Sequence, residues 1–126
     1  MTSTTTQAVI DRYFELMGRD EDFGSCYADD VQWTTFDGET VVRGPAEVRE
    51  YLTGLHHNMP DIRTRPLVYA ERTAYIEGDC ADPRRPSADR LAFCIAYDVG
   101  DGVITAARCY GSIGFLGPAG GAAPTS

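Results

Sequence analysis

The stretch that decides the fold is a pair of long apolar segments in the C-terminal part of the chain. It reads Asp89-Arg-Leu-Ala-Phe-Cys-Ile-Ala-Tyr-Asp-Val99, then Gly100-Asp-Gly102, then Val103-Ile-Thr-Ala-Ala-Arg-Cys-Tyr-Gly-Ser-Ile113. Apolar and aromatic residues on both sides of a glycine-rich turn are typical of two adjacent strands. Two further strand-like segments precede this pair, from Ile62 to Glu71 and from Thr73 to Ala81. The C-terminal half therefore predicts a run of long antiparallel strands.

The N-terminal half carries the helices. Apolar residues at helical spacing predict a first helix that ends near Gly18: Val9, Ile10, Tyr13, Phe14 and Met17. A short second helix is expected after Asp20 or Asp22 and through Tyr27. A third helix begins at Gly44-Pro45 and ends before Pro60, with Val48, Tyr51, Leu52 and Leu55 on one face. Strands from 31 to 37 and from 39 to 43 are predicted between the second and third helices.

Helices followed by a run of strands predict a segregated α+β fold in a single domain. We place that domain at residues 1–116, with an exposed loop at residues 82–87 because two prolines interrupt any strand there. Residues 117–126 are Gly, Ala, Pro, Thr and Ser, and we expect them to form a flexible C-terminal tail. A long curved sheet wrapped around helices leaves a pocket at its open end, and such pockets commonly bind ligands.

Composition narrows the classes of partner and cofactor. The net charge of −8 opposes binding to nucleic acid, and no apolar run is long enough to span a membrane. The polar N-terminal segment has no signal-peptide pattern, so we expect a cytoplasmic protein with reduced cysteines. The sequence has neither a Gly-x-Gly-x-x-Gly nor a Walker motif, and the adjacent His56 and His57 cannot both ligate one metal from a helix. We therefore expect no cofactor and no metal.

Several short motifs follow one another in a recognisable order. They are Arg12-Tyr13-Phe14, Tyr27-Ala-Asp-Asp-Val-Gln-Trp33, Val42-Arg43-Gly44-Pro-Ala-Glu-Val48, Asp101-Gly102-Val-Ile104 and Arg108-Cys-Tyr110. In this order and spacing the chain resembles SnoaL-like and ketosteroid-isomerase-like proteins of the nuclear-transport-factor-2-type superfamily. The resemblance implies a cone-like curved mixed or antiparallel sheet wrapped around about three N-terminal helices and enclosing a ligand cavity.

The resemblance also implies which residues of this chain correspond to the catalytic positions of the family. Tyr13 corresponds to the oxyanion-hole tyrosine of ketosteroid isomerases, whose hydroxyl donates a hydrogen bond to a carbonyl oxygen as that oxygen gains charge. The base aspartate of that family falls on Thr35, and its second acid falls near Ile95. Two of the three catalytic groups therefore differ, which argues against steroid isomerisation by that mechanism.

Strand alternation, combined with the family comparison, predicts which side chains face the cavity. Successive side chains of a strand point to opposite faces, so three sets share a face each. We expect all three sets to point inward: Trp33, Thr35 and Asp37; Tyr75, Glu77 and Asp79; Ala106, Arg108 and Tyr110. Beside Arg108, one interior acid would stay ionised while another stays protonated, which would supply a base and an acid together.

The candidate catalytic residues are therefore Tyr13, Asp37, Asp79 and Arg108. Candidate substrate-binding residues are Trp33, Thr35, Tyr51, His56, Tyr75, Glu77, Ile95 and Tyr110. Five of these residues have a structural alternative: Tyr13 as a core aromatic, Arg108 as a structural ion-pair partner, Glu77 and Asp79 turned to water, and His56 as a solvated helix end.

Two classes of function remain open. The first is a cofactor-independent enzyme of the isomerase, cyclase or dehydratase type, acting on a hydrophobic small molecule in secondary metabolism. A variant is epoxide opening by Asp37 or Asp79 with Arg108, as in limonene-type hydrolases, although Cys109 stands where that family has an aspartate. The second class is a ligand-binding module without catalysis. In either case the broad apolar face of the sheet predicts a homodimer.

Overall fold

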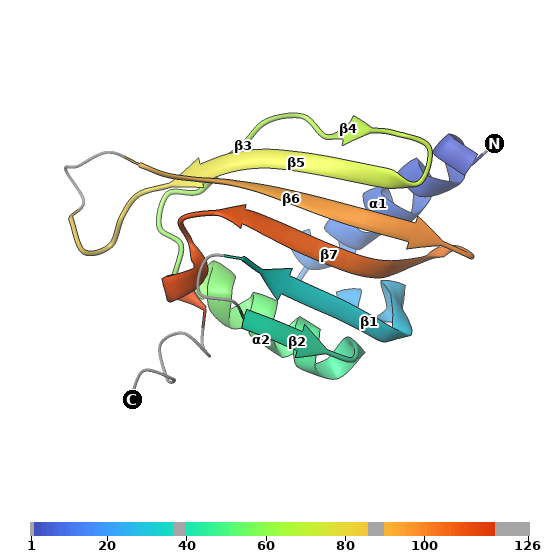
Figure 1. The fold of residues 1–126 in the computed structure, drawn as a ribbon, viewed down its shortest axis with the longest axis horizontal. Helices are drawn as coiled ribbons and strands as arrows, with labels where there is room; N and C mark the ends of the chain where they lie inside the picture. Colours follow the sequence, from blue (N-terminus) through green and yellow to red (C-terminus); the bar gives the residue numbers. More distant parts are fainter. Residues whose placement is uncertain (1, 37–39, 86–89, 118–126) are drawn as a thin grey trace.

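One twisted, curved sheet forms the body of the molecule (Figure 1). The computed structural model describes residues 2–36, 40–85 and 90–117, with side chains from Thr6 onward. Within these residues the strands are β1 (Tyr27–Thr35), β2 (Thr40–Arg43), β3 (Arg63–Thr64), β4 (Val68–Tyr69), β5 (Thr73–Cys80), β6 (Leu91–Gly100) and β7 (Val103–Gly111). Their order is β2-β1-β7-β6-β5-β3, and β4 also pairs with β5. The β1–β7 pair is parallel and the others are antiparallel, so the sheet is mixed.

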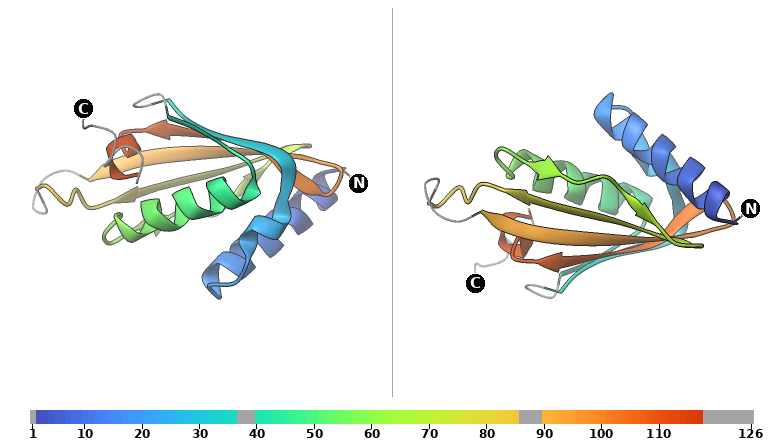
Figure 2. Two further views of the ribbon diagram at one scale, coloured as in Figure 1. Left: turned by 90° about the horizontal axis from the view of Figure 1, so that it is seen from below. Right: turned by 90° about the horizontal axis from the view of Figure 1, so that it is seen from above.

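Two α-helices in the described part of the chain cover the same face of this sheet (Figure 2). They are α1 (Thr2–Gly18) and α2 (Pro45–His57). In α2, Pro45 occupies the first turn, where its missing N–H costs no hydrogen bond, and Gly44 before it has φ 90°, a conformation that favours glycine. The α+β class and the ends of both helices are as the sequence predicts, although α1 begins earlier, within the threonine run.

The main difference between the expected and the observed helices concerns the second one. It is a four-residue 3₁₀ helix, η1 (Phe23–Cys26), after which the chain enters β1 directly at Tyr27. The Asp22 side chain accepts a hydrogen bond from the Gly24 amide at 3.0 Å, which stabilises one short turn. The segment lacks a longer stripe of apolar residues that would extend this turn into an α-helix. The described helices are thus two α-helices and short 3₁₀ turns, rather than three α-helices.

The expected strand from Ile62 to Glu71 is also shorter. It consists of the two-residue strands β3 and β4, with Pro66 between them, because proline cannot donate to a ladder. The predicted strands at 73–81, 89–99 and 103–113 correspond to β5, β6 and β7, and the last of these ends at Gly111, before a second 3₁₀ helix, η2 (Gly114–Leu116). The turn at Asp37-Gly38 and most of the C-terminal tail lie outside the described residues.

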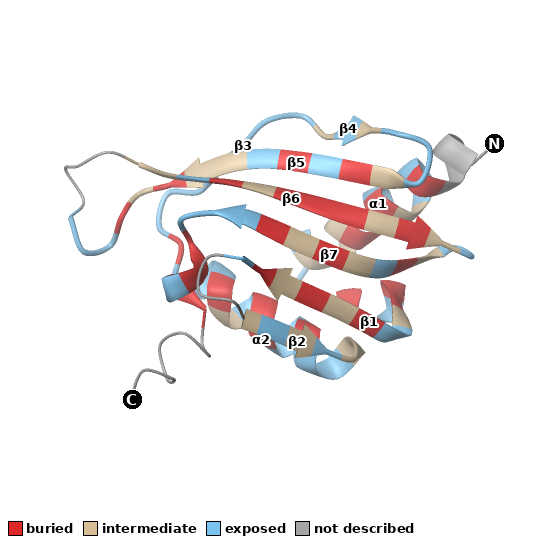
Figure 3. Ribbon diagram, viewed as in Figure 1, coloured by how far each residue is buried: buried red, intermediate tan, exposed pale blue. Residues whose placement is uncertain are grey.

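Buried and more exposed residues alternate along β5 and β7 (Figure 3), because the two faces of the sheet differ in burial. We call the face covered by the helices the inner face and the opposite one the outer face. On β6 the inner residues Phe93, Ile95, Tyr97 and Val99 are all buried. A register shift between Asp98 and Val99 leaves Thr105 of β7 as an extra residue, so that Ile104 and Ala107 are both buried although they differ in parity.

Side chains of the core fill the space between helices and sheet. The largest fully buried ones include Trp33, Tyr13, Ile10, Leu52 and Leu55, each contributing roughly 1.5–3 kcal/mol through burial. The enclosed cavity expected at this position is not confirmed by the described residues, and the two pockets described below are open to the surface. Neither α-helix of the described chain is long and apolar enough to cross a membrane.

Candidate functional site

Three of the sequence-predicted binding residues meet on the inner face near the C-terminal end of α2. Trp33 and Thr35 of β1 both point inward, and the Trp33 indole N–H donates a hydrogen bond to the Thr35 hydroxyl at 2.7 Å. Tyr51 comes from the buried stripe of α2, and its ring centroid is 6.2 Å from that of Trp33. We call Trp33, Thr35 and Tyr51 the β1–α2 cluster.

The hydroxyl of Tyr51 is the unusual atom of this cluster. Tyr51 is 5% exposed, and its hydroxyl has no hydrogen-bond partner among the described residues. Burial raises the pKa of Tyr51, while the nearby Thr35 hydroxyl acts in the opposite direction, so the phenol is neutral at ordinary pH. A buried polar atom without a partner costs about 1–3 kcal/mol, and natural proteins retain few of them. The hydroxyl therefore has an unused capacity to bind an oxygen-bearing ligand.

Tyr13, the predicted oxyanion-hole residue, lies in a second aromatic group. Its hydroxyl is 2.7 Å from that of Tyr27, and Tyr97 packs against its ring with centroids 5.5 Å apart. Burial raises the pKa of all three phenols. The sequence reading missed Tyr27 and Tyr97 as members of this site, although the spacing of Phe93, Ile95, Tyr97 and Val99 already placed Tyr97 on an apolar strand face.

The expected inward orientation of five residues is wrong. Tyr75, Glu77, Asp79, Arg108 and Tyr110 lie on the outer face, and Tyr75 and Tyr110 are 40% and 46% exposed. The alternation along β5 and β7 is as predicted, but the buried parity is the apolar one, Ala74 and Ile76 on β5 and Ala107 and Cys109 on β7. Burying acids and a guanidinium costs more than exposing them, which decides the face.

These outer charges are held in ion pairs. Arg108 donates to both carboxylate oxygens of Asp98, one of them at 3.2 Å. Asp79 accepts from Arg90 and from Arg63, the latter at 3.0 Å, and these two guanidinium groups lower its pKa. Each side chain has a structural partner, as the alternative interpretation of Arg108 anticipated.

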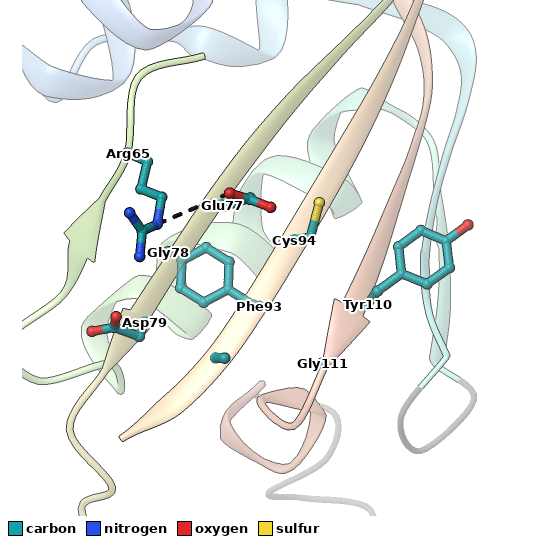
Figure 4. A pocket seen from close by; sticks show the side chains of 9 residues that line it. Arg65, Glu77, Gly78, Asp79, Phe93, Cys94, Tyr110 and Gly111 are labelled. Atoms are coloured by element: carbon teal, nitrogen blue, oxygen red, sulfur yellow. Dashed lines mark ion pairs between the residues drawn. The ribbon is translucent and has the colours of Figure 1, made fainter. Parts of the chain in front are cut away.

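An open pocket also lies on the outer face (Figure 4). It is an open groove of about 530 Å³ that brings together Glu77, Asp79 and Tyr110 with Cys94 and Arg65. The Glu77 carboxylate is 4.0 Å from the Arg65 guanidinium, and both side chains are exposed. Because Glu77 is exposed and Asp79 is paired with arginines, the groove does not offer the protected acid and base that the sequence predicts there.

The remaining predicted residues are dispersed. Ile95 is buried on the inner face, whereas His56 is exposed at the end of α2, where partial desolvation lowers the pKa of its imidazole. Asp37 lies outside the described residues. Within the described chain no group of three His, Cys, Asp or Glu side chains could hold a metal ion.

A second pocket lies beside the β1–α2 cluster. It has a volume of about 460 Å³ and is lined by His57, Asn58, Pro60, Pro83, Phe115, Leu116 and Gly117. We call it the α2-end pocket. Its residue Gly117 lies directly against Tyr51, since a Cβ added there would be 2.3 Å from the Tyr51 hydroxyl. His57, rather than the predicted His56, is the histidine of this pocket.

Comparison with known proteins places this geometry in context. A family model described as a SnoaL-like domain matches residues 10–107. No curated protein shows significant sequence similarity to the chain.

Solved structures share the architecture at low identity. A steroid delta-isomerase from Pseudomonas aeruginosa superposes with a TM-score of 0.73 at 13% identity, covering 89% of this chain and 85% of that one. A nuclear-transport-factor-2-like protein from Burkholderia xenovorans has a TM-score of 0.69 at 16% identity, covering 86% and 90%. A proposed polyketide cyclase from Xanthomonas campestris has a TM-score of 0.63 at 19% identity, covering 87% and 92%. At such identities the likeness to these structures concerns the fold alone.

Proposed function

The chain belongs to the SnoaL-like family, and from that premise we propose that it binds a small hydrophobic molecule through an oxygen atom and acts on it without a cofactor. The reaction class we propose is isomerase-, cyclase- or dehydratase-type proton transfer. The observation that carries the proposal is the buried Tyr51 hydroxyl, which has no partner among the described residues and lies beside Thr35 and Trp33.

A neutral phenol in an apolar site suits such chemistry. When a base removes a proton from the carbon next to a carbonyl group, negative charge develops on the carbonyl oxygen. A hydrogen bond from Tyr51 to that oxygen would strengthen as the charge grows, because the surrounding core excludes water. The raised pKa of Tyr51 keeps the donated proton on the phenol.

The epoxide-opening variant has less support. It needs Arg108 between carboxylates inside the site, and in the fold Arg108 is paired with Asp98 on the outer face. The acid that remains for proton transfer is Asp37, which the sequence supplies two residues after Thr35.

A ligand-binding module without catalysis is the second candidate. It is favoured by the composition of the described core, whose polar side chains near Tyr51 are hydroxyls, an indole and a thiol rather than carboxylates. Among the described residues the one buried carboxylate is Asp82, in the loop after β5 and paired with Arg84.

Binding of a ketone and of the matching hydrocarbon tests the role of Tyr51. Trp33 is the single tryptophan of the chain, so its fluorescence reports on the site directly. We expect 1-tetralone to bind about 2- to 13-fold more tightly than tetralin, which has the same rings without the oxygen. Tyr51→Phe should remove this difference, and Tyr75→Phe on the outer face should keep it. Equal affinities for ketone and hydrocarbon in the unmodified protein would refute the proposal.

Hydrogen exchange at carbon separates the enzyme from the binding module. In D₂O, nuclear magnetic resonance measures how fast the protons next to the 1-tetralone carbonyl are replaced by deuterium. Exchange faster than in buffer, lost in Asp37→Asn, supports an enzyme whose base is Asp37. Exchange at the buffer rate, with ketone binding intact, identifies a binding module.

We also propose that the outer face forms a homodimer. Five exposed apolar side chains share this face: Phe36, Val41, Val68, Tyr75 and Tyr110. Phe36 and Tyr110 stack with ring centroids 4.9 Å apart, which gives the patch a flat aromatic centre. Sedimentation at micromolar concentration should give a dimer, and Tyr110→Asp should dissociate it, whereas a monomeric unmodified protein would contradict the proposal.

A further inference from the structure

We propose that the α2-end pocket is the entrance and the body site for the ligand, and that Gly117 is the residue past which the oxygen of the ligand reaches Tyr51. This inference rests on the proposed function, because it concerns the same ligand. It adds the route, the class of molecule that fits, and a residue that determines specificity.

Gly117 separates the α2-end pocket from the β1–α2 cluster. It lines the pocket, and a Cβ added to it would lie 2.3 Å from the Tyr51 hydroxyl and 2.6 Å from the Tyr51 ring carbon that carries it. Its φ of −68° is open to any residue, so the backbone does not require glycine there. What this position requires is the lack of a side chain, because Gly117 packs directly against the Tyr51 hydroxyl, which has no partner among the described residues.

The segment that covers Tyr51 combines a buried core residue, Leu116, with contacts nearer the surface. We call residues 114–117 the η2 cover. The Asn58 side-chain amide donates to the Leu116 carbonyl at 2.7 Å, and the Arg84 guanidinium lies 4.0 Å from the centroid of the Phe115 ring. Asp82 in turn fixes Arg84, accepting hydrogen bonds from its guanidinium at 3.0 Å. Because Tyr51 is buried, a ligand would reach its hydroxyl through a shift of the η2 cover, which breaks these contacts and moves Leu116 out of the core.

The lining of the α2-end pocket defines the ligand class. Two prolines, Phe115 and Leu116 give apolar walls, and the polar side chains among the lining residues are those of His57 and Asn58. A volume of about 460 Å³ holds a molecule of a few fused rings. The expected ligand is therefore uncharged and cyclic, with a carbonyl or hydroxyl oxygen at the end that points toward Tyr51.

The test measures the kinetics and affinity of 1-tetralone by Trp33 fluorescence in stopped flow. Asn58→Ala frees the η2 cover and should raise the association rate about two- to tenfold. Gly117→Ala places a methyl group against the Tyr51 hydroxyl, which must then move, and it should weaken ketone affinity about tenfold or more. Thr53→Ala is the control, since its exposed hydroxyl bonds to the Arg49 carbonyl on α2 away from the pocket, and it should change neither quantity.

A measurement on the unmodified protein keeps the test independent of variant folding. Nuclear Overhauser contacts from the aromatic protons of 1-tetralone should reach the Phe115 ring and His57. Lack of these contacts, or unchanged kinetics and affinity in both Asn58→Ala and Gly117→Ala, would overturn the entrance while a loss of affinity in Tyr51→Phe still supported the proposed function. If 1-tetralone fails to bind the unmodified protein, the proposed function fails and the entrance fails with it.

Discussion

Two tyrosines on neighbouring rungs of the same strand pair have opposite environments. Tyr97 of β6 faces Ala74 of β5, and on the next rung Tyr75 of β5 faces Ala96 of β6. Tyr97 is 3% exposed and packs against Tyr13 and Phe14 of α1, whereas Tyr75 is 40% exposed on the outer face. The same Tyr–Ala pair therefore serves as core on one rung and as surface on the next.

The difference teaches that alternation defines two faces without saying which one is covered. The described polar side chains near Tyr51 on the inner face are neutral hydroxyls, an indole and a thiol, while the outer face carries the paired charges of Asp79, Asp98 and Arg108. Chemistry that depends on a protected donor belongs to the inner face. Chemistry that depends on ionised acids and arginines is already neutralised on the outer one.

The largest effect should come from truncating the two tyrosines of this pair. We expect Tyr97→Ala to lower the free energy of unfolding by about 3–5 kcal/mol, because it leaves a large cavity beneath α1. Tyr75→Ala should cost only about 0.2–1 kcal/mol, the value of a cross-strand contact. Urea denaturation followed by circular dichroism, at one protein concentration, gives both values. Equal losses would mean that the inner face is not the core.

The second largest effect should be a loss of folding stability at alkaline pH, caused by the buried tyrosines of the inner face. The pKa of Tyr13 and of Tyr97 is raised by burial, so the folded state keeps protons that the unfolded chain releases above about pH 10. The stability that these protons contribute is fully present below that pH. Above about pH 10 this stability falls by roughly 1.4 kcal/mol for each tyrosine and each pH unit.

Unfolding free energies at pH 9 and pH 11 measure this loss. Tyr97→Phe keeps the ring but removes one titrating hydroxyl, so the difference between the two pH values should shrink in that variant. An unmodified protein that is equally stable at both values would show that the buried phenols ionise as easily as those of the unfolded chain.

The smallest effect concerns the outer ion pair. Asp98 and Arg108 side chains are each 32% exposed, and a pair of this kind contributes about 0–1 kcal/mol. Arg108→Gln should therefore cost at most about 1 kcal/mol and leave 1-tetralone affinity within about twofold of the original. A tenfold loss of ligand affinity with the fold intact would restore Arg108 as a site residue.

Much of the fold could be predicted from local patterns. The helix that begins at Pro45 and the strand pair around Gly100-Asp-Gly102 follow from their own turn and periodicity signals. The prediction of a second α-helix was wrong because it rested on a helix-capping residue alone, with no stripe of apolar residues after it. The extra residue at Thr105 could not be predicted, since a bulge depends on the partner strand rather than on the sequence of β7 alone.

The candidate site was predictable only where polarity and burial agreed. Trp33, Thr35 and Tyr51 are apolar or neutral residues on apolar faces, and the fold brings them together. Glu77, Asp79 and Arg108 were expected to face inward from strand alternation and the family resemblance, but the desolvation cost of their charges determines their position. Gly117 has no sequence signal at all, because its role is defined by the distance to Tyr51.

The parallel pairing of β1 with β7 has a consequence for synthesis on the ribosome. It joins the N-terminal third of the chain to its last long strand, so the sheet has no centre until residues 103–111 have emerged. Before that moment β1 with β2, and β5 with β6, are separate hairpins with exposed edges. Completion of the sheet is thus postponed until β7 has been synthesised, and a chain terminated before Val103 has no strand to connect its two halves.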